Sequence, residues 1–183
     1  MHPNVRKLID MLMENTKGRM LYRRVIAVCK DVLRRHLCVV LVPDDVCKRE
    51  MSRADGDFCY KGPHAGRIRI RASLDETEQL STLIFELANM SQVVSFMHAY
   101  DHIGVVSRSQ FIDMNEKLET RSCRIHHRIA QWGIAHLSWD PFIDCYPDVD
   151  DYTDAQLMRE EARMHPWHRE YFGKLYDRIV RTY

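Results

Sequence analysis

Helical spacing dominates the pattern of apolar and polar positions along this chain. Apolar residues recur every three or four positions, and charged residues fill the opposite side of each segment. That spacing gathers the apolar side chains on one face of a helix. The segments that show it are 5–14, 19–35, 73–98, 107–137, 154–164 and 167–182. The pattern therefore predicts a chain built mainly of amphipathic helices.

Three short segments between the second and third predicted helices are typical of strands. Residues 37–42 are continuously apolar and stop at Pro43, as a buried strand does, and residues 57–60 form a shorter candidate. Residues 67–71 alternate strictly between arginine and isoleucine, so the two residue types face opposite ways. We predict a half-exposed or edge strand there. The charged stretch 43–52 is predicted to form a loop or a poor helix.

The order of these elements predicts an α+β fold in which helices dominate. We expect a small β-hairpin or three-stranded sheet packed on the helices, with additional helices in the C-terminal part. A chain of 183 residues fits a single domain, residues 1–183. That length is sufficient to bury about two-thirds of the surface of the unfolded chain.

Charge and hydropathy narrow the range of partners. The formal net charge of +1 gives no overall field that favours nucleic acid or a membrane surface. No apolar run approaches the roughly 18 residues that a membrane helix needs. The first residues lack the apolar core of a secretory signal. We therefore expect a protein partner rather than nucleic acid or a membrane.

The six cysteines are dispersed along the chain, and no two form a C-x-x-C pair. That spacing argues against a zinc ribbon or a thioredoxin-type motif. In a domain of this size we expect reduced, partly buried thiols and a reducing, cytoplasmic compartment. The even number of cysteines leaves disulfides as an alternative.

The helix predicted over 73–98 contains the sequence Phe85-Glu86-Leu87-Ala88-Asn89 after the predicted strands. This arrangement resembles a zincin, the metallopeptidase family whose helix carries H-E-x-x-H, with two zinc-binding histidines and a glutamate as general base. The segment Thr16–Leu21 is similar to the opening of bacterial type III effector metallopeptidases. The resemblance covers about residues 5–98, and residues 105–183 form a helical C-terminal portion outside it.

The resemblance also implies a substrate-binding strand. In such enzymes the alternating strand before the active helix is the edge that holds an extended peptide. Here that strand carries Arg67, Arg69 and Arg71, which the resemblance implies as binding residues, together with Asn89 of the helix.

The residues of the motif depart from the family at both metal-binding positions. Phe85 and Asn89 stand where the family has histidines. Phenylalanine cannot ligate a metal, and a neutral asparagine is a poor zinc ligand. Only Glu86 remains. We therefore expect no metal and no cofactor, and we favour a protein that is not an enzyme.

A later helix offers possible partners for Glu86. Glu119, Cys123 and His126 fall on one stripe of the helix predicted over 107–137. In zincins a third ligand often comes from a later helix, so Glu86, Glu119 and His126 together form a candidate acid–base site. The alternative is that these polar side chains are solvated or ion-paired on the helix flanks.

The sequence therefore favours a non-catalytic protein-binding domain on a degenerate metallopeptidase-like scaffold. We expect it to belong to the bacterial effector or toxin-associated class, acting in the cytoplasm or after delivery into the cytoplasm of a host or target cell. One alternative is an enzyme that uses Glu86 as general acid or base. The other is an immunity or adaptor protein with an unrelated helical fold. Fold alone does not decide between these functions.

Overall fold

Helices form most of the chain in the computed structural model, which describes residues 2–51, 54–146, 149–164 and 166–181. The helices are α1 (Pro3–Glu14), α2 (Thr16–Val28), α3 (Asp44–Glu50), α4 (Glu76–Met90), α5 (Val93–Asp101), α6 (Arg108–Leu137), α7 (Asp154–Met164) and α8 (Pro166–Val180). The strands are β1 (Cys38–Val42), β2 (Gly56–Cys59) and β3 (Arg67–Arg71). The predicted α+β fold with dominant helices is confirmed. Position 182, the predicted end of the last helix, lies outside the described residues.

The three strands form one mixed sheet in the order β1-β3-β2. Strand β3 pairs in parallel with β1 and antiparallel with β2, so it is the central strand. Of the two alternatives predicted for residues 67–71, the edge strand is therefore wrong, whereas the alternation of buried isoleucines with partly buried arginines fits the half-exposed strand. Strict alternation is also what a central strand shows when one face meets the core and the other carries paired charges. Strand β2, for which the sequence predicts only a short candidate strand, is an outer strand.

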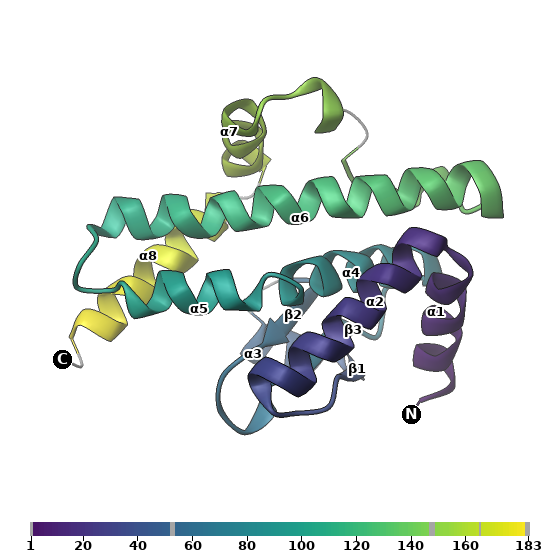
Figure 1. Cartoon of the computed structure of the whole chain (residues 1–183), viewed down its shortest axis with the longest axis horizontal. Coiled ribbons are helices and arrows are strands. Elements are labelled where there is room, and N and C mark those ends of the chain that lie inside the picture. Colours follow the sequence, from purple (N-terminus) through teal and green to yellow (C-terminus); the bar gives the residue numbers. More distant parts are fainter. Residues whose placement is uncertain (1, 52–53, 147–148, 165, 182–183) are drawn as a thin grey trace.

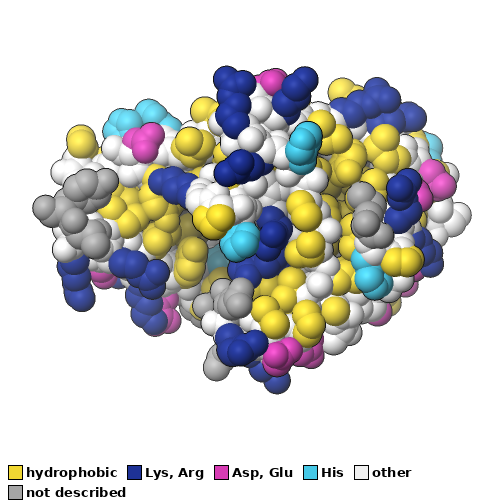
Figure 2. Space-filling model, turned by 90° about the horizontal axis from the view of Figure 1, so that it is seen from below, with side chains coloured by type: hydrophobic (Ala, Val, Ile, Leu, Met, Phe, Trp, Pro, Cys, Tyr) yellow, Lys and Arg dark blue, Asp and Glu magenta, His cyan; other side chains and the backbone are white. Residues whose placement is uncertain are grey.

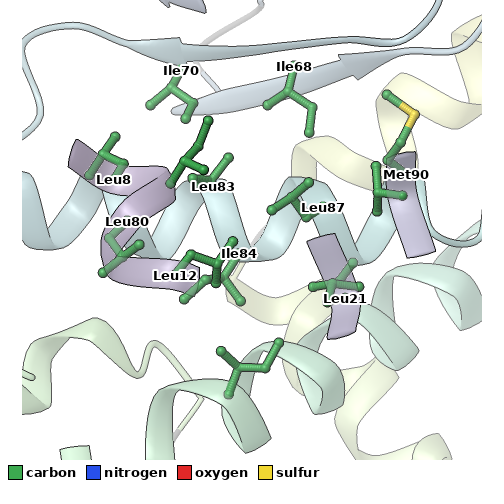
Figure 3. Close-up of a cluster of buried hydrophobic side chains, with 14 of the residues drawn as sticks. Leu8, Leu12, Leu21, Ile68, Ile70, Leu80, Leu83, Ile84, Leu87 and Met90 are labelled. Carbon is green, nitrogen blue, oxygen red and sulfur yellow. The ribbon is translucent and has the colours of Figure 1, made fainter. Parts of the chain in front are cut away.

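The core lies between the sheet and α4. Ile68 and Ile70 of β3 are fully buried and point towards α4 in Figure 3, where Leu83 and Leu87 face them. Helices α1 and α2 add Leu8, Leu12 and Leu21 to the same cluster. Burying one such leucine fully stabilises the fold by about 1.5–3 kcal/mol, so this cluster fixes the position of α4.

The segment predicted as one helix over 73–98 is two helices, α4 and α5, bent by 54° at their junction. One side chain at the junction binds a carbonyl that a continuous helix would use, and another binds the neighbouring helix α6. The Ser91 hydroxyl donates to the carbonyl of Ala88 at 2.7 Å, and the Gln92 amide donates to the carbonyl of Leu118 in α6 at 3.0 Å. No single described helix is long and apolar enough to cross a membrane; α4 and α5 reach that length and apolar character only as a bent pair.

Helix α6 runs along the whole molecule, as Figure 1 shows, and it contacts α4, α5, α7 and α8. It begins at a capping box between Ser107 and Gln110. A second apolar cluster, centred on Phe111 and Phe172, joins α6 to α5 and α8. The C-terminal helix is thereby held against α6 at the end of the molecule away from α1 (Figure 1).

The surface carries hydrophobic patches among basic side chains. On the face in Figure 2, hydrophobic side chains lie between dark blue lysine and arginine side chains, and acidic side chains lie towards the edges of the view. The most exposed large hydrophobic residues of the described chain are Phe142 and Val105.

Candidate functional site

A cavity of about 340 Å³ lies between strand β2 and four helices. Residues from β2 and the segment after it, α4, α5, α6 and α8 line it. Its volume is near the lower end of the roughly 300–1,000 Å³ that ligand pockets occupy. The acidic and amide groups in the lining are Asp57, Glu86, Asn89, Asn115 and Glu119. Residues from the N-terminal half of the chain and from its C-terminal helix thus line the same cavity.

Glu86 of α4 is 6% exposed and lines this cavity. Strand β2 comes close to it at Gly56, where a Cβ atom would meet Cγ of Glu86 at 3.1 Å. Burial raises the pKa of Glu86 well above its usual range, and the negative charges of Glu119 and Asp57 raise it further. A hydrogen bond with Asn89 acts in the opposite direction. A carboxyl group perturbed in this way, in a cavity, is typical of functional sites.

Two buried asparagines belong to the same lining, with their amide oxygens covered by surrounding atoms. Nδ2 of Asn89 donates to Oε2 of Glu119 at 3.1 Å, and Nδ2 of Asn115 donates to the carbonyl of Phe111 at 2.7 Å. The Oδ1 atoms of both asparagines are buried and have no hydrogen-bond donor within the described chain. Buried polar atoms are nearly always hydrogen-bonded, so two unmatched acceptors at one cavity are unusual.

Aromatic rings form the remaining wall. Phe58 of β2 contacts Phe96 of α5 with ring centroids 5.3 Å apart, and Tyr60 meets Tyr100 edge-on at 5.7 Å. The ammonium group of Lys61 lies 3.9 Å from the centroid of the Tyr100 ring. This distance is that of a cation–π contact. One end of the cavity wall therefore already holds a cation of the protein itself.

His126 does not belong to this cavity. It is fully buried, and its Nε2 atom lies 2.9 Å from the hydroxyl of Ser81. Its ring meets the rings of Phe85 and Tyr146 edge-on. Burial lowers the pKa of His126 to about 4, so the imidazole is neutral near pH 7. The structure therefore brings Glu86 and Glu119 together but separates His126 from them.

The arginines of β3 are not presented to an extended substrate. Arg69 donates to Asp57 of β2 from Nε at 2.8 Å, and Nη1 of Arg71 lies 3.0 Å from Asp55. Arg67 is half-buried in the same row. Both hydrogen-bonding edges of β3 are taken by β1 and β2. The substrate-edge role that the resemblance implies for Arg67, Arg69 and Arg71 does not fit this position.

The aromatic part of the site is not among the residues that the sequence patterns predict. A signal for it exists, because Phe58 and Tyr60 alternate on one face of β2 and its continuation, and Trp167 and Tyr171 are four residues apart on one helix face. Both pairs line the cavity. Their convergence could not be predicted, because it depends on how α8 packs on α6.

The structure contains neither a disulfide among its six cysteines nor, within the described ranges, a cluster of three His, Cys, Asp or Glu side chains that could hold a metal ion. Cys145 is an exposed residue, and its thiol lies 3.2 Å from the hydroxyl of Ser81. The described side chains that line the cavity include carboxyl groups, amide groups and aromatic rings.

No protein-family model, curated protein or solved structure matches this chain.

Proposed function

We propose that this protein is a non-catalytic binding domain that recognises another protein through the cavity between β2, α4, α6 and α8. The observation that carries the proposal is the cavity itself, in which buried polar groups lie among aromatic rings. Such a combination of an apolar wall and a few placed polar groups is typical of recognition pockets. Tyrosine and tryptophan, both present in this wall, are the residues that most often dominate binding energy at protein interfaces.

The metallopeptidase-like ancestry remains part of this proposal. Glu86 faces the cavity beside an outer strand, which is the general placement of the glutamate in an H-E-x-x-H helix. Phe85 and Asn89, at the two histidine positions, both line the cavity as well. In this interpretation the substrate cleft is retained as a binding site, and the metal ligands have been replaced by a ring and an amide.

Selection from a displayed library of random peptides tests the proposal. Peptides enriched on the wild-type protein are expected to bind Tyr171→Ala at least tenfold more weakly, because Tyr171 of α8 lines the cavity and is 50% exposed. Met20→Ala removes an exposed side chain of α2, which contributes nothing to the cavity, and is expected to leave affinity unchanged. Affinities can be measured by fluorescence anisotropy with the labelled peptides. Peptides that bind both variants equally, or no enrichment at all, would refute the proposal.

A second candidate function is catalysis with Glu86 as general acid or base. The raised pKa of Glu86 favours it, since a carboxyl group that holds its proton at higher pH can act as an acid. Glu119 stands in the same lining as a second carboxyl group. Mass spectrometry of the selected peptides after incubation separates the two candidates. Cleavage by the wild-type protein and not by Glu86→Gln would establish the enzyme.

The stability of Glu86→Gln gives an independent expectation. The raised pKa means that folding favours the protonated carboxyl, so the stability contributed by Glu86 falls as pH rises above the ordinary value of 4.5. A neutral glutamine is free of this penalty. We expect the variant to be more stable by about 0.5–2 kcal/mol at pH 7, the usual scale of a single stabilising substitution. Below pH 4 the difference should vanish. Urea unfolding at both pH values measures it, and a loss of stability at pH 7 would contradict the assigned role of burial.

A further inference from the structure

Two histidines lie side by side at the C-terminal end of α5, outside the cavity described above. His98 and His102 are four residues apart, a spacing that no other pair of histidines in the chain has. Residues four apart are neighbours on one face of a helix. The two ring centroids lie 4.1 Å apart, with the ring planes at 50° to each other. His98 is exposed and His102 is half-buried, so solvent reaches both side chains.

A hydrogen bond to the backbone fixes the orientation of the His102 ring. Nδ1 of His102 lies 2.8 Å from the carbonyl oxygen of His98. A carbonyl oxygen can only accept, so Nδ1 carries the hydrogen, and Nε2 of the neutral ring keeps its lone pair. Histidines that bind metal ions have this arrangement, in which one ring nitrogen donates to a carbonyl or a carboxylate and the other binds the ion. Within the described chain, Nε2 of His102 and the His98 ring have no hydrogen-bond partner.

The backbone that carries the two rings is held on both sides. Phe96 and Ala99 of the same helix are buried, which fixes α5 on the core. Beyond the end of α5, the amides of Val105 and Val106 donate to the carbonyl of His102 at 2.9 and 3.0 Å. Helices hold the ligands of a site more precisely than loops do. The two imidazoles are therefore presented from a fixed part of the molecule.

We infer that His98 and His102 together bind a late first-row transition metal ion, with Zn²⁺ as the representative ion. Imidazole nitrogen is a ligand that zinc, nickel and copper ions all accept. A zinc ion lies about 2.0–2.1 Å from each histidine nitrogen, so two rings that share it must be close neighbours, as these are. The exposed side chain of His98 is free to turn one of its nitrogens towards an ion on Nε2 of His102. This site is separate from Phe85 and Asn89, where the zincin motif has its ligands.

The number of protein ligands sets the character of this site. A catalytic zinc ion has about three protein ligands, and the described chain brings no third His, Cys, Asp or Glu to this pair. The ion should therefore exchange readily, and its other positions are open to water or to a side chain of another molecule. Phe96 and Tyr100 line the cavity from the same helix, but His98 and His102 do not. The inference thus stands independently of the proposed function.

Long-range ¹H–¹⁵N spectra of the ¹⁵N-labelled full-length chain test the inference, with zinc chloride as the probe and magnesium chloride as the control. Zn²⁺ is expected to shift the ring nitrogen resonances of His98 and His102 saturably, with Nε2 as the ligating atom of His102. Mg²⁺ binds oxygen ligands and should shift neither ring. If zinc produces no saturable shift at these two rings, even while cysteine thiols take it up elsewhere, the inference is overturned.

Single variants show whether the two rings act as a pair. Loss of even an outer partner of a metal ligand weakens metal binding about 10–100-fold, so His98→Gln and His102→Gln should each raise the Kd for Zn²⁺ at the remaining ring at least about tenfold. His64→Gln, which changes an exposed histidine at a turn, should leave the Kd unchanged. Amide resonances in the same samples report whether each variant is folded. Wild-type affinity at the remaining ring in either folded variant would show that the histidines do not chelate one ion, and the inference would be wrong.

Discussion

Acidification from pH 6.5 to pH 4 is expected to lower the free energy of unfolding by about 3 kcal/mol through His126 alone. Burial lowers the pKa of this histidine from about 6.5 to about 4, and each unit of difference between folded and unfolded states corresponds to about 1.4 kcal/mol. Within this pH range the unfolded chain binds a proton that the folded chain does not. Stability is therefore complete above pH 6.5 and declines as pH falls towards 4.

The surroundings of His126 explain the direction of this effect. Ser81 of α4 provides its hydrogen bond, and Phe85 and Tyr146 place rings around it. The charge of Asp144 raises the pKa of His126 and that of His127 lowers it, but desolvation is the largest effect. Nδ1 has no hydrogen-bond partner among described residues, so a proton there would be unsatisfied as well as charged.

The measurement compares variants rather than the wild-type pH profile alone. Glu86 acts in the opposite direction over part of this range, because its pKa is raised and its contribution falls as pH rises. Urea unfolding of wild type and His126→Gln at pH 6.5 and pH 4 isolates the histidine. The variant should lose about 3 kcal/mol less between the two pH values. His64→Gln, at an exposed turn, should behave like wild type. A variant slope equal to that of wild type would show that His126 is not protonated on unfolding.

The periodicity of the sequence predicts the elements but not their neighbours. The isoleucines of 67–71 do face the core, as their alternation indicates, yet the strand is central. Its parallel pairing with β1 is set by contacts between segments about 30 residues apart, and no local pattern encodes that choice. The apolar periodicity does not predict the break between α4 and α5 for a similar reason. Gln92 donates to Leu118 of α6, which only the folded molecule brings near.

Helix geometry explains why only two of the three residues proposed for an acid–base site lie together. Glu86 and Glu119 line one cavity because α4 and α6 pack against each other along their buried stripes. His126 shares the stripe of Glu119 but lies seven residues further, which is about 10 Å along a helix. That distance places it beside Ser81 instead of Glu86. A shared helix face therefore predicts a shared side of the core, and it does not predict a shared site.

Phe111→Ala is expected to have the largest effect on stability, a loss of about 3–5 kcal/mol, as is typical for removal of a buried phenylalanine. Phe111 of α6 is fully buried. Its ring lies 5.8 Å from that of Tyr100 in α5 and 5.7 Å from that of Tyr176 in α8. Because α5 and α8 carry part of the aromatic wall, loss of this contact should also loosen the cavity. We expect the peptides selected on the wild-type protein to bind at least about tenfold more weakly.

Leu8→Ala is the matched control for that prediction. Leu8 of α1 is equally buried, but it packs in the cluster beneath the sheet and does not line the cavity. Its truncation should lower the free energy of unfolding by about 2–5 kcal/mol, a similar amount, while the affinity for the selected peptides stays within about twofold of wild type. Urea unfolding gives the stabilities, and fluorescence anisotropy with the labelled peptides gives the affinities of the folded variants. If both variants lose affinity in proportion to stability, the wall formed by α5 and α8 has no specific part in binding. The two variants differ in which helices their buried side chains hold in place. Loss of affinity in Phe111→Ala alone would therefore show that the packing of α5 and α8 on α6 shapes the cavity.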